Sequence, residues 1–186
     1  FEEFRNQVIG AHQHYDTPYG RQKMIYADWV ASGRLYQPIE DVILNQIGPF
    51  VGNTHTETSE SGTLMTIAYK YSHKIIKEHV NAGPQDVIIT ADFGMTAVIN
   101  KLQRMLGLKY CARVAGRVCN SQKDKAVVFI THMEHHSNHT SWFETTADVV
   151  MIEPDENLLI SLENLRAKLE EYKDRTLKIG AFTACS

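Results

Sequence analysis

Short apolar runs alternate with amphipathic segments between residues 63 and 183, and this alternation constrains the fold more than any other feature. Strands are expected at residues 87–90, 126–131, 149–152 and 177–183. Helices are expected at residues 63–80, 94–106, 138–146 and 162–172. Strands that alternate with helices are typical of a mostly parallel sheet with helices on both faces. We therefore expect an α/β fold with three layers in the order αβα.

The N-terminal part of the sequence follows a different pattern. Residues 1–11 suit a short amphipathic helix, and residues 12–23 suit a polar loop. A short strand is expected at residues 24–29, and a helix at about residues 38–47. We expect residues 1–24 to be an N-terminal helix and arm that leads into the main fold.

Composition narrows the classes of protein to which this chain can belong. The net charge of −3 comes from 19 basic and 22 acidic residues spread along the sequence. No long basic block is present, which argues against a nucleic acid partner, and no apolar stretch suggests a membrane span. The three cysteines, Cys111, Cys119 and Cys185, form no CxxC pair, and this favours a reducing, cytoplasmic setting.

A first candidate site follows the expected strand at residues 87–90. The helix expected next begins with Gly94-Met95-Thr96. Exposed N–H groups and the helix dipole make such a turn suitable for an anion, and the Thr96 hydroxyl could donate a further hydrogen bond. The same residues also suit a plain turn and helix cap, and they match neither a G-x-G-x-x-G motif nor a P-loop.

A second candidate site directly follows the expected strand at residues 126–131. It contains four histidines, His132, His135, His136 and His139. If this segment were helical, the four side chains would share one face and could hold a metal ion. No H-E-x-x-H motif is present and no cysteine lies nearby, so structural histidines are an equally open interpretation.

Four stretches, taken together, carry a resemblance to a known family. They are Tyr26-Ala27-Asp28-Trp29-Val30-Ala31-Ser32-Gly33, Gly52-Asn53-Thr54-His55, Gly94-Met95-Thr96-Ala97-Val98-Ile99-Asn100 and Met133-Glu134-His135-His136-Ser137-Asn138. Their order and combination resemble the class V aminotransferase family, particularly its cysteine desulfurase and selenocysteine lyase branch. Each stretch is a weak signal alone, but the combination is specific to the family.

The resemblance implies an enzyme of the type I fold that uses pyridoxal 5'-phosphate, with residues 25–186 as the N-terminal part of its large domain. His135 would stack on the pyridine ring and could assist proton transfer. Gly94, Met95 and Thr96 would hold the phosphate. The family usually has a hydroxyl residue where Met95 stands, so one side-chain hydrogen bond to the phosphate would be lost.

The resemblance also implies an amino acid as substrate and a homodimer as the assembly. Ala31 and Ser32 would lie near the substrate carboxylate. His55 would approach the active site, and a dimer interface is one route by which it could do so. No metal ion is expected under this interpretation.

The activity implied is cleavage of a C–S or C–Se bond through an external aldimine, although transamination or another elimination would use the same chemistry. In the family, the lysine that forms the Schiff base lies beyond the last element of this sequence, and Lys101, Lys109 and Lys178 do not match its position. We therefore expect the N-terminal part of a longer enzyme, inactive by itself. The alternatives left open are a metal-binding protein built on the histidine cluster and a cofactor-free interaction module.

Overall fold

The computed structural model describes residues 1–110 and 124–184 and divides the chain into two compact units, Phe1–Ile88 and Ile89–Ser186. The three cysteines lie outside the described residues. The expected division into an arm at 1–24 and a partial domain at 25–186 does not coincide with this one and stays a prediction. In the described part of the chain, no helix is long and apolar enough to cross a membrane.

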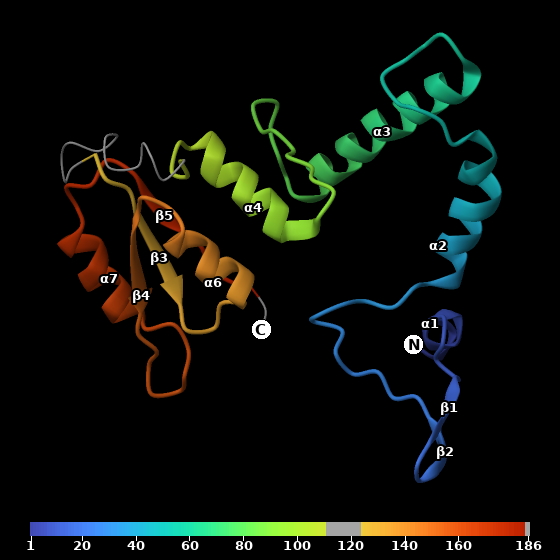
Figure 1. Cartoon of the computed structure of the whole chain (residues 1–186), viewed down its shortest axis with the longest axis horizontal. Helices are drawn as coiled ribbons and strands as arrows, with labels where there is room; N and C mark the ends of the chain where they lie inside the picture. Colours follow the sequence, from blue (N-terminus) through green and yellow to red (C-terminus); the bar gives the residue numbers. More distant parts are fainter. Residues whose placement is uncertain (111–123, 185–186) are drawn as a thin grey trace. The chain divides into compact units, whose positions relative to one another are not determined.

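The second unit is built on a parallel sheet in the order β4-β3-β5. Its strands are β3 (Val127–Thr131), β4 (Asp148–Ile152) and β5 (Lys178–Gly180). Its described helices are α4 (Gly94–Met105), α6 (His136–Phe143) and α7 (Leu162–Glu171). All of β3 is buried, because it is the central strand and helices cover both of its faces (Figure 1). The expected α/β fold is thereby confirmed.

Alternate residues of β3 separate the core into two layers. Val128 and Ile130 pack with Leu108 and Trp142, on the side of α4 and α6. Phe129, with its neighbour Val127, packs on the opposite side, against α7. A strand that is apolar on both faces reads as a continuous hydrophobic run, which is why the sequence predicted it well. The second unit therefore has the three layers expected from the alternation.

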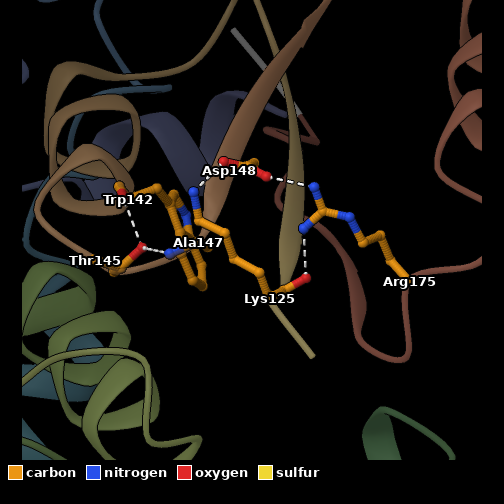
Figure 2. Close-up of polar contacts among 6 residues, drawn as sticks. All are labelled: Lys125, Trp142, Thr145, Ala147, Asp148 and Arg175. Carbon is orange, nitrogen blue, oxygen red and sulfur yellow. Dashed lines mark hydrogen bonds and ion pairs between the residues drawn. The ribbon is translucent and has the colours of Figure 1, made fainter. Parts of the chain in front are cut away.

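The charged residue at the start of β4 ties the amino ends of the strands together. The Asp148 carboxylate accepts hydrogen bonds from the Lys125 ammonium group and, at 2.6 Å, from the Arg175 guanidinium group (Figure 2). Arg175 also donates to the Lys125 carbonyl oxygen at 2.8 Å. The Thr145 hydroxyl donates to the Trp142 carbonyl oxygen at 2.7 Å and so closes the end of α6 before β4 begins. We refer to Asp148, Lys125 and Arg175 as the amino-edge clamp.

Two of the expected strands are wrong. Residues 24–29 and 87–90 have no strand structure, and the Val87 side chain is 81% exposed. A strand needs a neighbouring strand to receive its hydrogen bonds, and an apolar run does not specify that neighbour. The expected strand at 177–183 is shorter, because it ends at Gly180 as β5.

The first unit contains short elements and one long helix. In chain order they are α1 (Glu2–Gln7), β1 (His14–Thr17), β2 (Gly20–Lys23), α2 (Gln37–Val42), η1 (Ile43–Ile47), η2 (Gly48–Phe50) and α3 (Glu60–His79). The strands β1 and β2 pair as an antiparallel hairpin where a polar loop was expected. The helix α3 begins earlier than expected, because the Ser59 side chain caps it by accepting a hydrogen bond from Gly62 N–H at 3.2 Å.

Candidate functional site

The first turn of α4 presents unpaired donors at the start of a helix. Gly94 has a φ of +64°, a left-handed conformation that favours glycine. A Cβ atom at this position would meet no described atom within 4 Å, so the backbone is open to a ligand. The N–H groups of the first helical turn have no partners within the helix. Met95 is 68% exposed, and its side chain offers no strong hydrogen bond in place of a hydroxyl.

The loop after β3 holds His135 at the start of α6. His135 is the N-cap residue, and its Nδ1 atom accepts a hydrogen bond from the Ser137 N–H at 3.1 Å. The Ser137 hydroxyl lies 2.8 Å from the same nitrogen. In the neutral imidazole, Nε2 then carries the proton. These contacts with Ser137 orient the imidazole ring of His135, and the residue remains exposed to solvent.

The helices α4 and α6 run parallel to each other. Gln103 of α4 donates to the Ser141 hydroxyl of α6 at 3.1 Å, and these residues are 38 apart. Beyond the ends of the helices, the Thr146 N–H donates to the Leu108 carbonyl oxygen, again across 38 residues. An equal offset at both contacts means that the two segments run in the same direction.

The same offset locates the first turn of α4 relative to the loop after β3. The same offset of 38, applied toward the amino ends of the helices, pairs residue 98 of α4 with His136, where α6 begins. Gly94 then lies one helical turn, roughly 6 Å, beyond the start of α6. This is the level of the loop that carries His135. This offset indicates that the Gly94–Thr96 turn and His135 lie at the same ends of the two helices, on the side where β3 ends.

The sequence analysis missed the side chain that organises this edge. Glu134 is only 8% exposed and accepts hydrogen bonds from three residues. They are Thr131 (hydroxyl, 2.6 Å), Asn138 (amide, 2.8 Å) and Thr183 (N–H at 3.1 Å and hydroxyl at 2.7 Å). Burial alone would raise the pKa of Glu134, but the hydrogen bonds from Thr131, Thr183 and Asn138 outweigh it and hold that pKa below its usual value.

The four histidines of this region do not form a metal site. In the described residues, no group of three or more His, Cys, Asp or Glu side chains has a geometry that could hold a metal ion. The helix α6 begins at His136, so His132 and His135 lie before it and do not share its face. The ring of His139 instead lies against Phe143, with the ring centroids 5.1 Å apart. The metal-binding interpretation thus loses the geometry on which it depended.

Ala31 and Ser32 lie in a turn of the first unit that Tyr26 stabilises. The Tyr26 hydroxyl donates to the Ser32 carbonyl oxygen at 2.6 Å and lies 2.9 Å from the Ser32 hydroxyl. Ala31 is exposed. Tyr26 was not singled out in the sequence as a functional residue, although it lies inside the stretch that carried the resemblance.

His55 also lies in the first unit, in a loop anchored on α3. Its φ is +63°, and its N–H donates to the hydroxyl of the buried Thr66 at 2.9 Å. The imidazole meets the Tyr69 ring edge-on, with centroids 5.4 Å apart. Ala31, Ser32 and His55 therefore belong to one unit, and the Gly94–Thr96 turn and His135 belong to the other.

Comparisons with known proteins agree with this architecture. The structure is similar to the apo structure of a cysteine desulfurase from Thermococcus onnurineus NA1, with a TM-score of 0.67 and 18% sequence identity. The match covers 96% of this chain and 39% of the desulfurase chain, and at this identity it shows the fold alone. No curated protein sequence matches the chain significantly. The family model for aminotransferase class V matches residues 25–181, so this chain belongs to the class V aminotransferase family.

Proposed function

We propose that this chain is part of a pyridoxal 5'-phosphate enzyme that acts on an amino acid, of the cysteine desulfurase or selenocysteine lyase type. The observation that carries the proposal is the alignment of two features at one edge of the sheet. These are the open first turn of α4 and the exposed ring of His135. In open α/β folds, ligands bind at this carboxyl edge. Membership of the class V aminotransferase family adds independent support.

The donor groups in this structure fit a planar phosphorylated cofactor. The N–H groups of Gly94, Met95 and Thr96 begin a helix of 12 residues, whose dipole favours an anion. The Thr96 hydroxyl makes no hydrogen bond to another described side chain or backbone group, so it is available to a phosphate oxygen. The exposed imidazole of His135 offers a flat face to an aromatic ring.

Each residue has a defined task under this proposal. The first turn of α4 binds the phosphate, and His135 orients the ring through stacking. Because Ser137 occupies Nδ1 of His135, the Nε2 proton is the one available for transfer. The cofactor, when bound, supplies an electron sink for bonds broken at the substrate α-carbon. Ala31, Ser32 and His55 are proposed to contact the substrate, with Ala31 and Ser32 near its carboxylate.

A homodimer in the cytoplasm is the proposed state of the whole protein. The support comes from α3, whose outward apolar residues include Ile67 (58% exposed), Tyr71 (61%) and Ile75 (47%). Apolar side chains that gather on one helix are typical of a surface that another protein surface covers. Light scattering on the full-length protein tests the dimer directly.

The proposed function is tested on the full-length protein that contains this chain. Its absorbance is recorded with pyridoxal 5'-phosphate, before and after borohydride reduction, and peptide mapping then locates the modified lysine. Release of sulfide or selenide from cysteine or selenocysteine separates the proposed activity from transamination. A colourless protein that does not bind the added cofactor would overturn the proposal.

Two substitutions test the assigned residues, each against a matched control. Thr96→Val and His135→Ala should each weaken cofactor binding about tenfold, the loss expected for one hydrogen bond or ring contact of roughly 1.4 kcal/mol. The control for Thr96 is Thr140→Val, since Thr140 is an exposed threonine of α6. The control for His135 is His136→Ala, one residue further along. Both controls should bind within about twofold of the unmodified protein.

A further inference from the structure

Glu134 joins three segments that are distant in the sequence. Its carboxylate accepts from Thr131 at the end of β3, from Asn138 in α6, and from Thr183 after β5. Thr183 lies 49 residues away from Glu134 along the chain. No other described residue of the second unit ties the carboxyl end of β3 to both α6 and the segment after β5. We call Glu134 and these three partners the carboxyl-edge clamp.

The orientation of Asn138 fixes the charge state that the clamp requires. The Asn138 oxygen accepts from the Trp142 indole N–H at 3.0 Å, and its amide nitrogen also donates to the Ala181 carbonyl oxygen at 3.2 Å. Turning the amide over would break both bonds, so its N–H must point at Glu134. The Thr183 N–H also points at Glu134, at 3.1 Å. An ionised carboxylate accepts all of these donors, whereas a side-chain amide would set one N–H against another.

We propose that Glu134 is a positioning residue, whose buried carboxylate holds His135 and the segment after β5 in place at the carboxyl edge of the sheet. His135 is the next residue along the chain and begins α6, so its backbone position follows that of Glu134. The part of this inference that concerns cofactor binding rests on the proposed function. The contacts among Glu134, Asn138 and Thr183 do not depend on it.

A purely structural role and a positioning role give different results. A structural role would lower thermal stability and leave cofactor affinity unchanged at a temperature where the protein is folded. A positioning role changes affinity at that temperature, because the ring of His135 and the segment after β5 no longer hold their places. Asp148 supplies the matched control, since it is a carboxylate of the same sheet with a lowered pKa, at the opposite edge.

The experiment compares five forms of the full-length protein, freed of cofactor: unmodified, Glu134→Gln, Thr183→Val, Thr183→Ser and Asp148→Asn. Titration with pyridoxal 5'-phosphate gives the affinity, and circular dichroism confirms folding at the titration temperature. Hydrogen exchange of the peptide covering residues 179–184 gives a readout that needs no cofactor. Thr183→Val keeps the test valid if Glu134→Gln does not fold.

We expect Glu134→Gln and Thr183→Val to weaken cofactor binding about tenfold, as expected for loss of charge-assisted hydrogen bonds. Glu134→Gln should also speed exchange in residues 179–184. Thr183→Ser keeps both donors and should bind within about twofold of the unmodified protein. Asp148→Asn should lower the melting temperature without changing affinity or the exchange of that peptide.

Two results would overturn the inference. One is unchanged affinity and unchanged exchange in Glu134→Gln, or unchanged affinity in Thr183→Val if Glu134→Gln does not fold. The other is an equal loss of affinity in Asp148→Asn. If the unmodified protein binds no cofactor, the proposed function fails by itself. The exchange measurement then decides whether Glu134 holds the segment after β5.

Discussion

The amino-edge clamp makes a quantitative prediction for Asp148→Asn. The substitution keeps the size of the side chain and removes its charge, so both cations face a neutral amide. The side chains of Asp148, Lys125 and Arg175 are 30%, 33% and 14% exposed, so solvent screens the interactions only in part. A hydrogen bond to a charged group contributes about 1.5–3 kcal/mol, and the amide oxygen retains part of one bond. We expect a loss of about 2 kcal/mol in the free energy of unfolding at pH 7.

The loss should depend on pH in a direction that follows from the pKa of Asp148. Burial alone would raise that pKa, but hydrogen bonds and charges from Lys125 and Arg175 outweigh it and lower it. The unfolded chain therefore binds this proton at a higher pH than the folded chain does, near the ordinary value of about 4. The stabilisation is present above that value and is lost as the pH falls through the folded pKa. The difference in the free energy of unfolding between the unmodified protein and Asp148→Asn should therefore become smaller as the pH falls.

Urea unfolding at pH 7 and at about pH 3, below the unfolded-chain pKa, measures both effects, from the shift in midpoint multiplied by the slope. Glu171→Gln is the control, because it removes an ion pair with Lys168 in α7 whose carboxylate is 52% exposed. Exposed pairs contribute little, so the control should change stability by less than about 1 kcal/mol. A loss in Asp148→Asn that is the same at both pH values would refute the reasoning. So would an equal loss in the control.

Two further substitutions test the left-handed backbone positions. Gly94→Ala should lose about 1 kcal/mol in urea unfolding, because φ is +64° while the added methyl group meets no described atom. An unchanged stability would contradict that conformation. Leu158→Gly should raise the free energy of unfolding by about 0.5 kcal/mol. Glycine removes the steric strain of leucine at a φ of +62°, and this gain exceeds the backbone entropy that glycine loses on folding. Little packing is lost, because the Leu158 side chain is 68% exposed. Leu159→Gly, at a neighbouring position that is 59% exposed and without positive φ, should lose stability instead.

The core of the second unit could be predicted because its central strand is apolar on both faces. The expected strand at 126–131 corresponds to β3, and the expected strand at 149–152 corresponds to β4. The apolar run at 87–90 carries the same signal but forms no strand. An apolar run indicates that a segment can be buried. Whether it forms a strand depends on hydrogen bonds to a neighbouring strand, which the run itself does not specify.

The hairpin of the first unit was missed for a different reason. Its strands β1 and β2 are almost entirely exposed, so no hydrophobic alternation marks them. The turn is held by the Thr17 hydroxyl, which donates to the Gly20 carbonyl oxygen at 2.8 Å and accepts from the Tyr19 N–H at 3.1 Å. A threonine followed by proline and glycine was the available signal for this turn.

Features of the candidate site that depend on local geometry could be predicted from the sequence, whereas features that depend on long-range packing could not. The helix start at Gly94 depends on residues within one helical turn and was expected from the sequence, whereas α6 begins at His136, two residues before the expected helix. Glu134 reads as an ordinary charge beside His135, since its burial depends on Thr183, 49 residues away. Charged side chains are seldom buried unless they are paired, so a glutamate gives no expectation of burial by itself.

The parallel packing of α4 and α6 explains how two weak sequence signals become one candidate site. Each helix follows its own loop, and the sequence gives no distance between Gly94 and His135. The bonds from Gln103 to Ser141 and from Thr146 to Leu108 share the same offset, so the two helices start on the same side of the sheet. A slip of one residue between the helices would turn the buried Gln103 amide N–H away from Ser141, and a buried donor left without its partner costs about 1–3 kcal/mol. Packing in the core therefore sets the alignment of the two helix starts that form the candidate site.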